Sequence, residues 1–165
     1  MRIAFGCKAG SGKDTACSYL QSRHGGVITR FAAPIYDIMY FAQDRAGIPR
    51  HKDRRFLRWI GTTWGRAQNP DIWVNAVIDD VRALSEDTNV FIADVRFPNE
   101  FDALRKEGFL LVRINRPRDD TQVEEDISET ALDDNVSWDC VISNSGTIEG
   151  LHDMLNRFVQ RYTHE

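Results

Sequence analysis

The sequence predicts an α/β protein with a parallel β-sheet and a phosphate-binding loop. Short apolar runs alternate with amphipathic helical segments along the 165 residues, as in parallel α/β sheets. The first apolar run, Ile3–Phe5, leads into a glycine-rich loop that ends in Gly12-Lys13-Asp14-Thr15 and continues as a helix. A strand, a glycine loop and a helix N-terminus in that order form a cradle for anionic oxygens, to which the lysine adds a positive charge. We therefore expect the protein to handle a nucleoside triphosphate.

The glycine loop matches the P-loop pattern with two departures. Cys7 stands at the pattern's first glycine, and Asp14 separates Lys13 from the Thr15 hydroxyl. A chance glycine-rich turn before a helix is the alternative, and the position of the loop between a strand and a helix disfavours it. We expect Lys13 to contact the β- and γ-phosphates and the Thr15 hydroxyl to serve either phosphate or metal. The expected cradle consists of Gly10, Ser11, Gly12 and the amides of Asp14 and Thr15.

The first half of the chain is predicted to be mostly helical. The predicted strands are Ile3–Phe5 and 27–31, and the predicted helices are 15–23, 35–45, 53–66 and one that starts at 69. The helix over 53–66 is inferred because Phe56, Trp59, Ile60 and Thr63 repeat at α-helical spacing, which assigns Trp59 to the buried face. Asn69-Pro70-Asp71 is a strong helix start, with asparagine as the N-cap and proline at the first position.

The second half continues the alternation of strands and helices. The predicted strands are 90–93, 110–114 and 138–142, and the predicted helices are 99–107 and a terminal helix capped by Thr147. The polar, acidic stretch from Asn115 to Asn135 is too long for an ordinary loop. Loops of this length are often lids over an active site.

Composition limits the classes of function. The length and a hydrophobic content of 42% suit one domain with its own core. No apolar run approaches the roughly 20 residues that span a membrane, and three cysteines without metal-ligand spacing indicate reduced thiols in a cytoplasm. A net charge of −4 argues against a general nucleic-acid binder, although the segment from Arg45 to Arg66 is locally basic. Such a segment suits a small, highly charged ligand.

The clearest second cluster is Asp94-Val95-Arg96, at the end of the predicted third strand. In open parallel sheets the carboxyl ends of the strands line the ligand crevice, so these side chains should face the glycine loop. Asp94 can bind Mg²⁺ or its waters or receive an acceptor's proton, and Arg96 can hold a phosphate bidentately. An Asp–Arg pair that fixes a turn is the alternative.

Further candidates lie in the helical region and beside the predicted lid. Arg66 follows Gly65 at a helix end and can bind an acceptor phosphate, which needs more than one cation. Arg116, with Arg118 second, can close over the transferred group, and a surface arginine is the alternative. The remaining candidates are Glu129 with Leu132-Asp133-Asp134, which could order the lid or be solvated, and Tyr36 and Trp73, which could stack on a nucleobase or simply pack.

These segments together resemble bacteriophage-type deoxynucleoside monophosphate kinases. The resemblance covers nearly the whole chain, and its most specific pieces are Lys13-Asp14-Thr15 and Asp94-Val95-Arg96-Phe97-Pro98-Asn99-Glu100. Weaker matches are Gly65-Arg66, Pro70-Asp71-Ile72-Trp73-Val74, Ser128-Glu129, Leu132-Asp133-Asp134 and Ile142-x-Asn144-x-Gly146-Thr147. Two residues depart from the family pattern. Cys7 replaces the first glycine of the loop, and Ile127 stands where the family often has a histidine. No catalytic role is therefore assigned to residue 127.

The resemblance implies a three-layer α/β/α P-loop fold similar to adenylate and thymidylate kinases. It implies one domain, 1–165, with a monophosphate-binding helical region at about 35–84 and a lid at about 115–135. It further implies ATP and Mg²⁺ on the loop, with Asn144, Gly146 and Thr147 near the adenine and Arg66 and Arg96 on a deoxynucleoside monophosphate.

We therefore expect a cytoplasmic kinase (in the host cytoplasm for a phage-encoded chain), with a homodimer left open because related kinases are often dimers. Lys13, Asp94, Arg96 and Arg116 are the expected catalytic residues, and Thr15 and Asp94 the expected metal ligands. Three alternatives stay open: a kinase of dephospho-coenzyme A, a kinase of a modified base in DNA, and a nucleotide-binding module that transfers no phosphate. A nucleotide-binding module that transfers no phosphate needs no second phosphate site, so the surplus of arginines disfavours this alternative.

Overall fold

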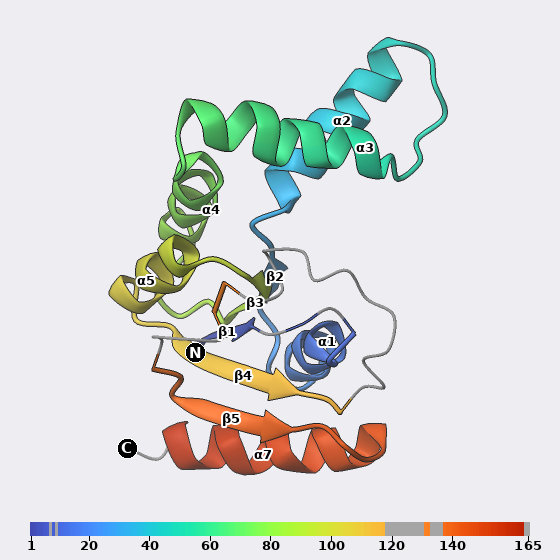
Figure 1. Cartoon of the computed structure of the whole chain (residues 1–165). Coiled ribbons are helices and arrows are strands. Elements are labelled where there is room, and N and C mark those ends of the chain that lie inside the picture. The colour runs from blue at the N-terminus through green and yellow to red at the C-terminus, as the bar shows by residue number, and fades with distance from the viewer. Residues whose placement is uncertain (7, 9, 118–130, 133–136, 164–165) are drawn as a thin grey trace. The chain divides into compact units, whose positions relative to one another are not determined.

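The computed structural model describes residues 1–6, 8, 10–117, 131–132 and 137–163 (Figure 1). Contacts between α-carbons divide the chain into two compact units. The first consists of Met1–Thr29 and Ser85–Glu165, and the second of Arg30–Leu84. We call them the sheet unit and the helical unit, and each is described by itself.

The sheet unit contains one parallel sheet. Its strands are β1 (Arg2–Gly6), β2 (Val27–Thr29), β3 (Val90–Val95), β4 (Leu110–Asn115) and β5 (Cys140–Ser143), in the order β2-β3-β1-β4-β5. The predicted parallel sheet is confirmed. The strand predicted at 27–31 ends at Thr29, and the strand predicted to begin at 138 begins at Cys140. β1 lies at the centre, so the loop that follows it leaves the middle of the sheet.

Helices cover both faces of this sheet. They are α1 (Lys13–His24), α5 (Pro98–Lys106) and α7 (Ile148–Thr163). Alternate residues of β1, Ile3 and Phe5, join buried residues of α1 and α7 in one core. The chain moves from β1 through α1 to one edge and from β3 through α5 toward the other, so right-handed crossovers place α1 and α5 on opposite faces (Figure 1). The predicted three-layer arrangement is confirmed.

The helical unit contains α2 (Ala33–Arg45), α3 (Arg54–Arg58), a π-helix, η1 (Trp59–Arg66), and α4 (Ile72–Arg82). The Asp53 carboxylate starts α3 by accepting hydrogen bonds from the amides of Arg55 and Phe56, at 2.9 and 3.0 Å. The prediction of one α-helix over 53–66 is wrong after Arg58, where the π-helix begins. Its wider turn buries Ile60, Gly61 and Gly65 and leaves Trp59 49% exposed.

The start of α4 also differs from the prediction. The helix begins at Ile72, with Asp71 at the N-cap position. Asn69 makes a local turn instead, because its side-chain oxygen accepts a hydrogen bond of 2.9 Å from the Asp71 amide. The polar start signal is therefore real, but Asn69 acts two residues before the N-cap position, Asp71.

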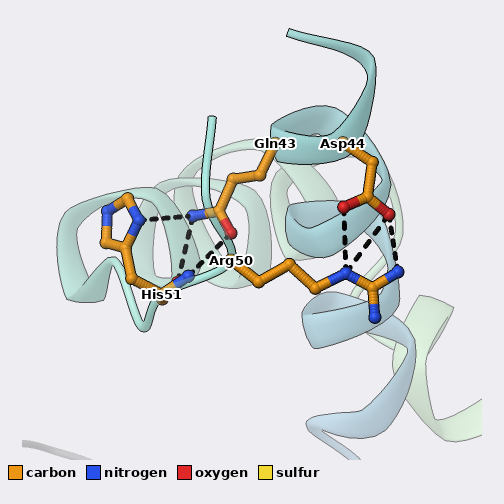
Figure 2. Close-up of polar contacts among 4 residues, drawn as sticks. All are labelled: Gln43, Asp44, Arg50 and His51. Atoms are coloured by element: carbon orange, nitrogen blue, oxygen red, sulfur yellow. Dashed lines mark hydrogen bonds and ion pairs between the residues drawn. The ribbon is translucent and has the colours of Figure 1, made fainter. Parts of the chain in front are cut away.

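Two side chains of α2 fix the loop that follows this helix (Figure 2). The buried Gln43 amide donates to the His51 carbonyl at 3.0 Å and accepts from the His51 backbone N–H at 3.1 Å. On the exposed side, the Arg50 guanidinium donates to the Asp44 carboxylate through Nε and Nη2, at 2.9 and 2.6 Å. The basic loop over 46–53 is thus held at two points.

Within the described ranges, none of the helices has the length and apolar character needed to cross a bilayer.

Candidate functional site

The glycine loop joins β1 to α1 and folds around Lys13. Gly10 and Gly12 have φ angles of 71° and 108°, which L-residues with side chains rarely adopt. Lys13 is the first residue of α1 and is only 6% exposed. Its ammonium donates to the Lys8 carbonyl at 2.6 Å and lies 3.4 Å from Ser11 Oγ, so it spans the loop. The predicted loop, its glycines and its lysine therefore come together at a helix N-terminus, the arrangement that binds phosphate.

Asn144, directly after the edge strand β5, holds this loop. Its buried side-chain amide donates a hydrogen bond of 2.8 Å to the Ser11 carbonyl, and its backbone N–H donates to the Asn115 carbonyl at 2.7 Å. A Cβ added at Gly12 would stand 2.6 Å from Asn144 Nδ2, so the amide lies directly against the glycine. Asn144 thus positions the loop, a role that local sequence patterns did not indicate. The adenine contact expected for it stays a prediction.

A shallow groove of about 520 Å³ lies beside the loop, between α1 and α7. Asp14 and Thr15 line it from α1, and Ile148, 60% exposed, lines it from α7. Tyr19 and His152 add stacked rings, with centroids 3.8 Å apart and planes 9° from parallel. No local sequence signal indicates Tyr19, Ile148 or His152, because they lie on two separate helices.

The groove adjoins the segment expected to lie near the adenine. The Thr147 hydroxyl accepts from the Gly150 amide at 3.2 Å, so Thr147 caps α7 as predicted. Hydrogen bonds from its own backbone and from Thr147 keep the pKa of the exposed Glu149 below its ordinary value. At Gly146 a Cβ would meet nothing within 4 Å, so the residue leaves open space.

Asp94 and Arg96 flank the last residue of β3, Val95, which is paired with Gly6 at the end of β1. The sheet therefore brings both half-buried residues to the edge from which the glycine loop leaves. Behind them, the Glu100 carboxylate, 2% exposed, accepts hydrogen bonds from the backbone amides of Arg96 at 2.7 Å and Phe97 at 3.1 Å. Glu100 was not predicted to have a role, although a glutamate three residues into a helix is a capping signal.

β4 brings two further arginines to the same edge. Arg113 is in register with Gly6, and its side chain donates to Asn115 Oδ1 at 2.9 Å and to the Leu132 carbonyl at 3.3 Å. Arg116 directly follows β4 and is exposed. Arg118, Glu129, Asp133 and Asp134 lie outside the described residues, as does most of the predicted lid.

The helical unit holds the other predicted substrate residues. Arg66 is the last residue of η1, and its Nη1 donates to the Pro70 carbonyl at 3.4 Å. The half-buried Tyr36 ring has the Lys52 ammonium 5.7 Å from its centroid. Trp73 is 3% exposed and its indole N–H donates to the Gly61 carbonyl at 2.8 Å, so its ring is covered by the protein. The expectation that Trp73 stacks on a nucleobase is corrected: the ring packs against η1.

The oxygen donors at the sheet edge fit magnesium. The described residues contain no cluster of three histidine, cysteine or acidic side chains of the kind that holds a metal by itself. Magnesium instead commonly takes one or two protein oxygens, with substrate phosphates and water completing its octahedron. The Thr15 hydroxyl and the Asp94 carboxylate are such donors: Thr15 lies in the first turn of α1, after β1, and Asp94 lies within β3, which pairs with β1.

The family profile described as "Deoxynucleotide monophosphate kinase" matches residues 49–155. This range includes Arg66, Asp94, Arg96, Arg116 and Asn144. The crystal structure of TT1252 from Thermus thermophilus superposes with a TM-score of 0.52 at 17% identity and covers 98% of each chain, which shows a shared fold.

Two viral relatives match larger shares of the chain. A putative deoxynucleotide monophosphate kinase of Acanthamoeba polyphaga mimivirus is 30% identical over 176 residues, covering 88% of this chain and 89% of its own. The uncharacterized protein ORF77 of Ictalurid herpesvirus 1 (strain Auburn) is 39% identical over 163 residues, covering 95% of this chain and 69% of its own. These matches support a nucleotide kinase role, and the chain belongs to the deoxynucleotide monophosphate kinase family.

Proposed function

We propose that this protein transfers the γ-phosphoryl group of ATP to a deoxynucleoside monophosphate. The observation that supports this most directly is the glycine loop, with the buried Lys13 ammonium lying across it and Asn144 fixing the Ser11 carbonyl. A buried ammonium at a helix N-terminus is suited to a polyphosphate. Membership of the family supports the class of acceptor.

On the donor side, Lys13 and the amides of the loop hold the β- and γ-phosphates. Thr15 and Asp94 hold Mg²⁺, which neutralises phosphate charge when bound. The base lies toward Asn144, Gly146 and Thr147, where the groove between α1 and α7 offers Ile148 as an apolar contact. Phosphoryl transfer depends mainly on positioning and charge, so no nucleophile from the protein is needed.

On the acceptor side, Arg96 binds the phosphate of the monophosphate in the sheet unit, and Arg66 is the phosphate-binding candidate of the helical unit. A phosphate oxygen of the acceptor attacks the γ-phosphorus in line with the bond to the leaving ADP oxygen. Arg116 stabilises negative charge that spreads over the transferred group.

The test is an ADP-release assay with Mg·ATP against a panel of deoxynucleoside and ribonucleoside monophosphates. Lys13→Ala and Arg96→Ala should each reduce turnover at least about a hundredfold. Lys106→Ala and Arg157→Ala are matched controls, because they remove the same charges from exposed positions on α5 and α7. Both controls should retain wild-type kinetics.

Other outcomes would point elsewhere. ATP binding without turnover on any monophosphate would contradict the proposal and favour a larger acceptor or a module that transfers no phosphate. Salt-sensitive duplex binding would then indicate DNA, and turnover on dephospho-coenzyme A would indicate that acceptor. Equal turnover in Lys13→Ala and the wild type would overturn the assignment of the loop.

A further inference from the structure

The helical unit contains an eight-residue π-helix, η1, whose last residue is Arg66. π-helices are rare, appear mostly as single turns and often occur at functional sites. This one is held by a residue from the next helix, since the buried Trp73 indole of α4 donates to the Gly61 carbonyl at 2.8 Å. The contact is buried, so its loss would remove a buried hydrogen bond to this carbonyl.

The same indole lies against Gly65. A Cβ there would stand 2.4 Å from Trp73 Cζ2 and 2.8 Å from the Ile60 carbonyl oxygen, so only glycine allows the ring to approach this closely. Trp73 therefore touches the backbone at two points, Gly61 and Gly65. Both lie within the turn that precedes Arg66.

The geometry of a π-helix connects these two points to Arg66. In such a helix the carbonyl of one residue pairs with the amide five residues later, which places Gly61 and Arg66 at the two ends of one turn. Gly65 directly precedes Arg66 in the chain. The Trp73 ring thus contacts the backbone at both Gly61 and Gly65, in the turn that leads directly into Arg66.

We propose that Trp73 is a positioning residue for acceptor binding, acting through η1 on Arg66. This inference rests on the proposed function, in which Arg66 binds the acceptor phosphate. Trp73 itself does not touch the acceptor, because its ring is only 3% exposed. The Arg66 guanidinium spans from η1 to the Pro70 carbonyl just before α4, so a shift of η1 against α4 moves its charge.

Trp73→Phe tests the inference by removing the N–H donor while keeping an aromatic ring. The KM for the deoxynucleoside monophosphate should rise about tenfold, as expected for a lost buried hydrogen bond that shifts a binding group. The kcat and the KM for ATP should stay within about twofold. Trp64→Phe is the matched control, since Trp64 lies on the same π-helix and is 42% exposed. Its acceptor KM should not change.

A second variant isolates the indole N–H. Site-specific replacement of Trp73 by 3-benzothienylalanine keeps the shape of the ring and puts sulfur in place of the N–H. The same rise in acceptor KM is expected, and thermal unfolding of each variant shows that the protein measured is folded. A fall in melting temperature with an unchanged acceptor KM in both variants would overturn the inference, because it would show a purely structural role.

Arg66→Ala separates failure of this inference from failure of the proposed function. Absence of turnover on every monophosphate in the wild type would remove both. If Arg66→Ala raises the acceptor KM and the two Trp73 variants do not, only the inference about Trp73 is wrong. If Arg66→Ala leaves the acceptor KM unchanged, Arg66 does not bind the acceptor and Trp73 has nothing to position.

Discussion

The side-chain amide of Asn144 donates a hydrogen bond of 2.8 Å to the carbonyl of Ser11, across 133 positions of sequence. Both residues are buried, at 5% and 2% exposure. The contact joins the end of the last strand to the turn of the glycine loop before Lys13. It therefore makes the conformation of the loop depend on a residue far away in the chain.

Asn144→Ala should weaken ATP binding and destabilise the fold. It leaves the Ser11 carbonyl without this partner, which costs about 1–3 kcal/mol when a buried acceptor is involved. We expect a rise in the KM for ATP of about tenfold, measured with saturating acceptor, and a lower melting temperature. Asn75→Ala, at an exposed position of α4, is the control. An unchanged KM for ATP would show that the loop keeps its shape without Asn144.

Gly12→Ala should impair the loop more severely. The φ angle of 108° is strained for alanine, and the new Cβ would stand 2.6 Å from Asn144 Nδ2 and 3.3 Å from Leu151 Cδ2. We expect a loss of stability of about 1–3 kcal/mol and of most ATP-dependent turnover. Gly150→Ala in α7 is the control, since its Cβ meets only Thr147 Oγ1, at 3.8 Å, and alanine favours helix. Denaturant unfolding and ADP release measure the two effects, and wild-type values for both in Gly12→Ala would contradict the prediction.

Substitutions of Glu100 should weaken binding of the acceptor rather than binding of ATP. Its buried carboxylate fixes the backbone amides of Arg96 and Phe97, and hydrogen bonds to a charged group contribute about 1.5–3 kcal/mol. Glu100→Ala should therefore raise the acceptor KM several-fold and lower the melting temperature, while Glu100→Gln, which keeps one acceptor oxygen, should do less. Glu86→Gln, at an exposed position, is the control. An equal rise in the KM for ATP would contradict this prediction, because it would show that Glu100 supports the whole edge of the sheet and not acceptor binding alone.

The Asp44–Arg50 pair should give a small, pH-dependent contribution to stability. The hydrogen bond from Arg50 lowers the pKa of Asp44 below its ordinary value of 3.8, and charge attraction adds to this. Because the folded pKa is the lower one, the contribution is complete above the unfolded pKa and is lost as pH falls through the folded pKa. Both groups are exposed, so Asp44→Asn should lower the melting temperature at neutral pH by a few degrees at most.

Melting curves of the wild type and Asp44→Asn over a range of acidic pH check this. The difference between the two proteins should shrink toward zero as the pH falls below about 3.8. Asp79→Asn, at an exposed position of α4, controls for the general loss of a carboxylate. A difference that grows with acidity would contradict the assignment.

Local patterns were sufficient to predict the sheet and the loop. Continuous apolar runs predicted the central strands β1, β3 and β4, since central parallel strands are buried on both faces, and the edge strands β2 and β5 were predicted with other bounds than the structure shows. The glycines and Lys13 were found because the loop and its ligand-binding atoms lie within one short segment. Asp94 and Arg96 followed from the rule that strand ends meet at one edge.

The roles of Asn144 and Glu100 could not be predicted in the same way. The partner of Asn144, Ser11, is distant in sequence, and nothing near either residue indicates the contact. Glu100 was part of a recognised segment, but its role depends on the burial of its carboxylate and on the hydrogen bond that it accepts from the Arg96 amide. For Trp73, stacking on a base and packing both stayed open, because an aromatic residue in a binding region serves either purpose equally well in a sequence.

The π-helix could not be predicted for a different reason. An α-helical period assigned Trp59 to the buried face, whereas the wider turn exposes it and buries Ile60, Gly61 and Gly65. Residue types do not reveal this period, because the same apolar and small residues suit either helix. The glycines at 61 and 65 are understood only once the Trp73 ring is seen against them.

The π-helix also makes the number of residues before Arg66 a property of the site. A π-helical pairing spans five residues where an α-helical one spans four, so this segment holds one residue more than an α-helix with the same number of turns. If the segment took the α-helical period at its present length, Arg66 would be carried about 100° further round the helix axis although every side chain was unchanged. Deleting one residue between Ile60 and Gly65 would compensate for that rotation, so the length and the period of the segment together set where the arginine points.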